Sequence, residues 1–91
     1  MEELLARLIA LQPKAQRIFE GNMREEFGDV PDTAVWATLE YGYDGDPRWH
    51  CGFLYSSWTA IGPVTRWALR AVRRTPAEAV QAMLDDIRIA N

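Results

Sequence analysis

The sequence has few of the residues from which catalytic and metal sites are built. It contains one cysteine, Cys51, and one histidine, His50, in 91 residues. A single cysteine excludes an intramolecular disulfide and indicates a reducing compartment. One His and one Cys also fall short of the ligand set of a zinc site. The two residues are neighbours in a stretch that alternates like a strand, so their side chains are expected to face opposite ways and not to act as a nucleophile–base pair. We therefore expect neither enzymatic activity nor a metal or cofactor.

Long apolar runs are also missing. No stretch approaches the roughly 20 consecutive apolar residues that span a bilayer. The N-terminus, MEELLARLIALQP, begins with acidic residues and lacks the basic region that starts a signal peptide. We expect a cytoplasmic protein with no membrane partner.

Aromatic and other apolar residues are plentiful. Hydrophobic residues make up 48% of the chain and charged residues 25%, which is the composition of a globular domain. Four Trp, three Tyr and three Phe each bury a large area, so this short chain can build a core without disulfides. The length predicts a single domain covering residues 1–91.

Both ends of the chain have helical periodicity. Apolar residues recur every three or four positions between residues 4 and 19, and Pro13 either kinks this helix or begins a second one. Near the C-terminus, Thr75 is a good helix cap, followed by Pro76 at the first helical position and Glu78 as the partner of a capping box. The apolar face of this last helix is expected to consist of Ala79, Val80, Met83, Leu84 and Ile87.

Between the helices the apolar period shortens to two, which is typical of strands. Residues 34–42 and 49–56 alternate in this way on either side of the turn-forming sequence DGDP, so we expect an antiparallel hairpin. The sequence SSWTAIGP that follows is expected to be a turn or loop.

Residues 65–73 fit the pattern of a helix or of a strand. We favour the strand, because Arg73 and Arg74 then form a short connection to the last helix and because a third strand stabilises a hairpin. The predicted fold class is α+β, with the order α-β-β-β-α. In this fold a three-stranded antiparallel sheet packs against N- and C-terminal helices.

Charge is distributed unevenly along the chain, whose net charge is −3. Residues 20–46 contain eight acids and one arginine, whereas residues 47–74 contain five arginines and no acid. Such a charge distribution can steer a charged partner. We predict an acidic protein-binding patch that consists of Glu25, Glu26, Asp29, Asp32, Glu40, Asp44 and Asp46. The alternative is a basic patch that consists of Arg66, Arg70, Arg73 and Arg74. A third interpretation is that the two clusters neutralise each other within the folded chain.

The tryptophans define a further candidate surface. In the predicted strands, Trp49 and Trp67 fall on the core face and Trp36 on the opposite face. Trp58, in the expected loop, falls on the same side as Trp36 if the strand alternation is continued to it. Exposed aromatic side chains on an open sheet face mark a partner-binding surface or a homodimer interface. The alternative is that the N-terminal segment folds over that face as well.

The end of the chain carries a family resemblance. The sequence from Trp67-Ala68-Leu69 to Thr75-Pro76-Ala77-Glu78-Ala79-Val80 resembles the strand–TPxEA–helix ending of many small phage and mobile-element proteins, and HicB-like antitoxin domains end similarly. The predicted order α-β-β-β-α is also that of double-stranded RNA-binding domains. Those domains begin their last helix with basic residues, whereas this chain has Pro76-Ala77-Glu78-Ala79, which argues against RNA binding by that route.

The resemblance and the acidic residues together predict a small non-enzymatic protein-binding module. The resemblance implies an inhibitor of a host defence complex, as anti-CRISPR proteins are, in which carboxylates imitate the phosphates of a nucleic acid. One alternative is a nucleic-acid-binding module that uses Arg66, Arg70, Arg73 and Arg74, although the net negative charge argues against a nucleic-acid partner. Another alternative is a homodimeric antitoxin-like or phage accessory subunit.

Overall fold

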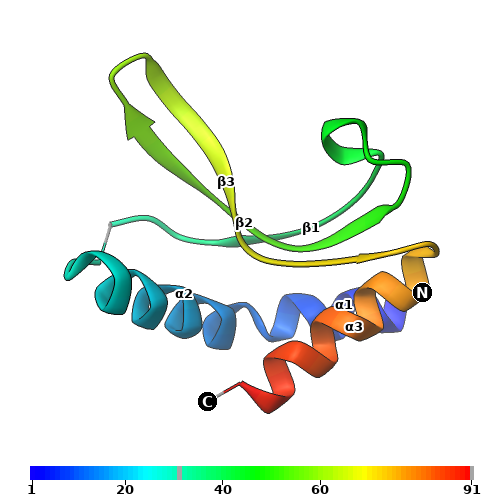
Figure 1. Cartoon of the computed structure of the whole chain (residues 1–91). Helices are drawn as coiled ribbons and strands as arrows, with labels where there is room; N and C mark the ends of the chain where they lie inside the picture. Colours follow the sequence, from blue (N-terminus) through cyan, green and yellow to red (C-terminus); the bar gives the residue numbers. More distant parts are fainter. Residues whose placement is uncertain (31, 91) are drawn as a thin grey trace.

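The chain folds into three helices and one three-stranded sheet, and the computed structural model describes residues 1–30 and 32–90. Its elements are α1 (Glu2–Ala10), α2 (Gln12–Phe27), β1 (Trp36–Tyr41), the 3-10 turn η1 (Tyr43–Gly45), β2 (Trp49–Thr59), β3 (Gly62–Arg73) and α3 (Pro76–Ile89). The sheet is antiparallel with the order β1-β2-β3. The three helices lie on one face of this sheet, the helix-covered face, and leave an open face on the other side (Figure 1). The predicted α+β class is confirmed, and the contested residues 65–73 form a strand.

The N-terminal segment is two helices rather than one kinked helix. Only Leu11 separates α1 from α2, and Pro13 lies in the first turn of α2, where its missing N–H is not needed. At its other end α2 stops at Gly28, which has φ 73° and donates its N–H to the carbonyl oxygen of Arg24 at 2.8 Å. Glycine adopts this left-handed conformation without steric cost, so it ends the helix cleanly.

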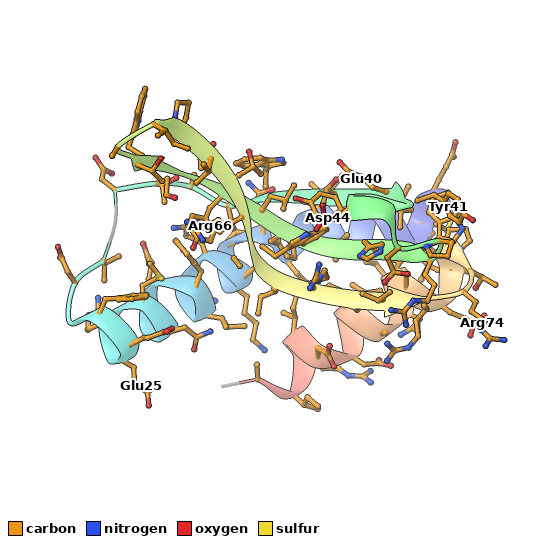
Figure 2. The ribbon with its side chains drawn as sticks, turned by 45° about the horizontal axis from the view of Figure 1, so that its top comes forward. Glu25, Glu40, Tyr41, Asp44, Arg66 and Arg74 are labelled. Atoms are coloured by element: carbon orange, nitrogen blue, oxygen red, sulfur yellow. The ribbon has the colours of Figure 1, made fainter. Side chains whose placement is uncertain are left out.

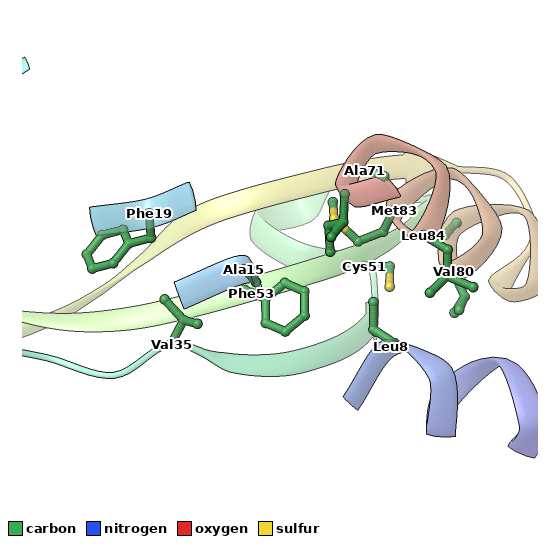
Figure 3. Close-up of a cluster of buried hydrophobic side chains, with 12 residues drawn as sticks. Leu8, Ala15, Phe19, Val35, Cys51, Phe53, Ala71, Val80, Met83 and Leu84 are labelled. Atoms are coloured by element: carbon green, nitrogen blue, oxygen red, sulfur yellow. The ribbon is translucent and has the colours of Figure 1, made fainter. Parts of the chain in front are cut away.

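One hydrophobic core lies between the helices and the sheet (Figure 3). Leu8 of α1, Phe19 of α2 and Met83 of α3 pack there against Cys51 and Phe53 of β2. All five residues predicted for the apolar face of α3 are buried: Ala79, Val80, Met83, Leu84 and Ile87. Helical and strand periodicity therefore identified most of this core correctly.

The start of α3 also agrees with the prediction. The hydroxyl oxygen of Thr75 accepts a hydrogen bond from the N–H of Glu78 at 3.2 Å. In return, the Thr75 hydroxyl donates to the carboxylate of Glu78 at 2.7 Å. The first turn of α3 thereby gains an acceptor for one of its free N–H groups.

The expected loop at residues 56–63 is wrong, because β2 and β3 continue through it as a long hairpin. Only Ala60 and Ile61 form the turn, and the hydroxyl of Thr59 closes it by donating to the carbonyl oxygen of Gly62 at 2.8 Å. We call residues 55–66 the arm. In Figure 1 the arm rises away from the helices on the open side of the sheet.

A β-bulge separates the arm from the rest of the sheet. Phe53 pairs with Leu69, but Leu54 pairs with Trp67, so that Ala68 is an extra residue in β3. One extra residue exchanges the two faces for everything beyond it. Trp67 therefore lies on the open face opposite Leu54, and the prediction that it faces the core is wrong. Arg66, the next residue toward the turn, shares the helix-covered face with Tyr55, its partner in the register.

The close approach of β3 beside the bulge explains the glycine at position 52. A Cβ atom at Gly52 would overlap the carbonyl oxygen of Leu69 and lie 2.8 Å from its carbonyl carbon. These are backbone atoms, so they cannot move aside without separating the strands. We expect Gly52→Ala to lower the free energy of unfolding by about 3 kcal/mol or more, measured by chemical denaturation.

Gly21 provides the matched control for Gly52. It lies within α2, and a Cβ atom there would meet nothing within 4 Å. Because glycine disfavours a helix interior, Gly21→Ala should raise the free energy of unfolding by roughly 0.5–1 kcal/mol. Equal effects of the two substitutions would contradict the packing inferred at Gly52.

The cap of α3 gives a second stability prediction. Thr75→Ala removes the acceptor of the Glu78 N–H, so the free energy of unfolding should fall by about 0.5–2 kcal/mol. Thr75→Ser keeps the hydroxyl and should remain close to wild type. An unchanged denaturation midpoint for Thr75→Ala would contradict this role of the hydroxyl.

Candidate functional site

The end of α2 and the loop after it carry four exposed carboxylates. We call this group the acidic end, and it consists of Glu25, Glu26, Asp29 and Asp32. Asp29 accepts a hydrogen bond from the N–H of Val30 at 2.8 Å. Within residues 1–30 and 32–90, no ion pair involves any of the four. Their charges are therefore directed to solvent and not balanced within the described fold.

The other three predicted acids lie in a second group, at β1 and the turn after it. Figure 2 places Glu25 at one end of the molecule and Glu40 and Asp44 well away from it, above the sheet. Glu40 accepts a hydrogen bond from the hydroxyl of Thr38 at 3.3 Å. The seven acids therefore form two separate surfaces, of which the acidic end is the larger.

Asp46 belongs to the second group, but its carboxylate is already paired with Arg48. The Arg48 guanidinium donates to both of its carboxylate oxygens, at 2.8 and 2.6 Å. These bonds hold the pKa of the Asp46 carboxyl below its usual range. Among the described residues, this is the only ion pair between an acid of residues 20–46 and an arginine of residues 47–74. Direct pairing between the two charge clusters is therefore limited to Asp46 and Arg48.

The four predicted arginines do not share one surface. Arg70 lies on the open face, with its guanidinium carbon 5.5 Å from the ring centroid of Trp67. Arg66 lies on the other side of β3 beyond the bulge. Arg74 is at the far end of the strand from Arg66, as Figure 2 shows, and Arg73 is next to it in sequence. One flat surface of an anionic partner could therefore not contact all four arginines.

The open face is partly covered by aromatic packing that the sequence did not indicate. The ring of Tyr43, in η1, lies 5.8 Å from that of His50 and 5.1 Å from that of Trp67, measured between centroids. His50 is only 2% exposed, and no described residue hydrogen-bonds to either of its ring nitrogens. Its closest carboxylate oxygen, from Asp46, is 3.7 Å away. The cluster of Tyr43, His50 and Trp67 is therefore held by ring packing. The buried imidazole without a hydrogen-bond partner lowers the free energy of unfolding by about 1–3 kcal/mol.

His50 and Cys51 are separated as their neighbouring positions predicted. Cys51 is fully buried in the core on the helix-covered face, whereas His50 packs on the open face. Burial raises the pKa of the Cys51 thiol to about 11, so it stays protonated and unreactive near neutral pH. This Cys–His pair has no geometry for nucleophilic catalysis.

Trp36 and Trp58 are both exposed on the open face, at 40% and 82%. Trp36 pairs with Leu54, and Trp58 lies four residues further along β2, so about 13 Å separates the two positions. Trp58 is close to Ile61, which is 94% exposed at the turn of the arm. The two tryptophans therefore do not form one continuous patch, and Trp58 belongs to the tip of the arm.

Membrane-spanning helices and clustered metal ligands are both absent from the described residues. None of the helices is long and apolar enough to cross a membrane. Within the same residues, no group of three or more His, Cys, Asp or Glu side chains is arranged to hold a metal ion.

Comparison with known proteins adds no family to this description. No protein-family model matches the chain, and neither the curated proteins nor the solved structures gave a match. The geometry and charge of the chain itself therefore define the candidate site, and the acidic end is its centre.

Proposed function

We propose that this chain is a small protein-binding module whose acidic end enters a basic site on its partner. The observation that carries the proposal is the exposure of Glu25, Glu26, Asp29 and Asp32 without ion pairs among the described residues. An exposed group of one sign attracts a partner of the opposite sign and accelerates the encounter.

The position of these acids on α2 supports a role in binding rather than in stability. The C-terminal end of a helix carries a partial negative charge, so carboxylates there are unfavourable by about 0.3–1 kcal/mol each. Glu25 and Glu26 lie in that last turn, where Arg24 is the only basic residue. The helix dipole and the two carboxylates add to the same negative potential, which a basic partner would stabilise.

A nucleic-acid-binding protein is the partner class that best fits this charge. Its binding channel is lined with Lys and Arg, and carboxylates spaced along a helix end and loop can take the places of phosphates. The resemblance of the C-terminal segment to small phage proteins supports the more specific proposal of an inhibitor of a host defence complex.

The ribbon formed by β2 and β3, with the turn after it, favours nucleic-acid binding as a second candidate function. Residues 49–74 contain four arginines and no acid, and a two-stranded β-ribbon fits the major groove of DNA. The separation of Arg66 from Arg70 by the bulge argues against it, because one groove would meet only some of these cations.

The protein-binding proposal predicts a specific loss on neutralising the acidic end. The test variant combines Glu25→Gln, Glu26→Gln, Asp29→Asn and Asp32→Asn. The control removes the same four charges elsewhere, with Glu2→Gln, Glu40→Gln, Asp44→Asn and Asp86→Asn. Immobilised wild type and control should capture the same DNA-binding protein from bacterial lysate, duplex DNA should compete for it, and the test variant should lose it. Equal capture by all three proteins would overturn the proposal.

The second candidate makes the opposite prediction in a mobility-shift measurement. With mixed single-stranded and duplex oligonucleotides at low salt, we expect the wild-type chain to give no shift. A shift that weakens steeply with salt, and disappears when Arg66, Arg70, Arg73 and Arg74 are changed to Gln, would favour nucleic-acid binding instead.

A further inference from the structure

A hollow of about 280 Å³ lies between α2 and the start of the arm. Five of its lining residues come from α2, with the spacing of one helix face: Phe19, Asn22, Met23, Glu26 and Phe27. The opposite side comes from Tyr55 of β2 and from Trp67 and Ala68 of β3.

The hollow exists because the arm leaves the helical layer. The apolar stripe of α2 that packs in the core at Phe19 continues along the same face to Phe27. Beyond the bulge at Ala68 the arm rises away from α2, as Figure 1 shows. Phe27 is therefore 65% exposed although it continues a buried stripe. The last two turns of α2 thus present a face that residues 1–30 and 32–90 leave partly uncovered.

The lining combines aromatic rings with one carboxylate. Phe19 and Tyr55 are in contact, with ring centroids 4.5 Å apart, and Phe27 lies two helical turns beyond Phe19. Glu26 contributes the charge and Asn22 a carboxamide. The faces of aromatic rings attract cations, and the attraction grows when a carboxylate balances the charge. This combination suits a positively charged group with a long apolar stem.

We propose that this hollow binds one arginine or lysine side chain of the protein partner. The inference rests on the proposed function, since Glu26 belongs to both the acidic end and the hollow. Its volume of about 280 Å³ is near the lower end of the 300–1,000 Å³ typical of ligand pockets, so it has room for one long side chain. An anchoring side chain in an aromatic pocket is also where binding energy concentrates in protein interfaces.

Arg66 is the charged group of the chain itself that matters most here. It pairs with Tyr55 in the register and faces the same side of the sheet, but it does not line the hollow. Among the described residues, it forms no ion pair with Glu26. Its positive charge opposes the entry of another cation, so Arg66→Gln should strengthen cation binding.

The test uses NMR titration with Nα-acetyl-arginine amide, which carries one positive charge. Nα-acetyl-citrulline amide is the neutral probe of nearly the same shape. We expect the arginine probe to shift the ring resonances of Phe27 and Tyr55, and the citrulline probe to leave them in place. Equal shifts with both probes would overturn the inference.

Matched variants locate the charge that acts. Glu26→Gln and Phe27→Leu should each weaken binding of the arginine probe about three- to fivefold. Glu25→Gln removes the same charge from a residue outside the hollow and should stay within about twofold of wild type. Equal weakening by Glu25→Gln and Glu26→Gln, or weaker binding by Arg66→Gln, would overturn the inference. Amide NMR spectra that match the wild-type spectrum away from the substituted residue will show that each variant is folded.

The two proposals fail in different ways. If the acidic end captures its partner but the arginine probe does not bind in the hollow, the protein-binding proposal stands and the inference of a side-chain pocket is wrong. If the probe binds at Phe27 and Tyr55 but neutralising the acidic end leaves capture unchanged, the pocket stands and the use of the acidic end is wrong.

Discussion

The single extra residue in β3, Ala68, determines how the rest of the molecule is arranged. Because it interrupts the alternation of β3, side chains before and after it point to opposite faces. It places Trp67 over the open face, turns Arg66 toward the helices and directs the arm away from α2. Gly52 is its structural counterpart on β2, since only a residue without Cβ permits β3 to approach so closely there. The open-face cluster and the uncovered end of α2 both follow from this local change in register.

Charge in this chain is organised by region more than by pairing. The acidic end lies on a helix terminus whose dipole has the same sign, and among the described residues it has no ion-pair partner. By contrast, the acid nearest to the arginines, Asp46, is bound to Arg48 through both oxygens. A segment that forgoes stabilising pairs is an expected location for function, because local rules are most often broken at functional sites.

The sequence predicted an element correctly where a single physical signal, such as periodicity or helix capping, determines that element. Periodicity identified the buried face of α3, and the capping residues identified its start at Thr75. The arm was missed because Ser56, Ser57 and Gly62 have turn-like composition, yet cross-strand pairing keeps these residues in strands. The orientation of Trp67 was missed because a bulge leaves no clear mark in the apolar pattern. The hollow beside Phe27 could not be predicted without the bulge. In the sequence, its only sign was that the apolar face of α2 continues at Met23 and Phe27.

The position of β3 at the margin of the sheet gives its arginines a role that requires no ligand. In the order β1-β2-β3, the twelve-residue β3 has a free backbone edge along the described sheet. Long edge strands invite pairing with other chains, which leads to aggregation, especially beside exposed apolar residues such as Trp58 and Ile61. Arg66, Arg70 and Arg73 place positive charge at intervals along this edge, so an identical strand that approached it would meet like charges. Charges along an edge strand disfavour its pairing with another chain, so these arginines have a physical reason to occupy the edge that is independent of any ligand.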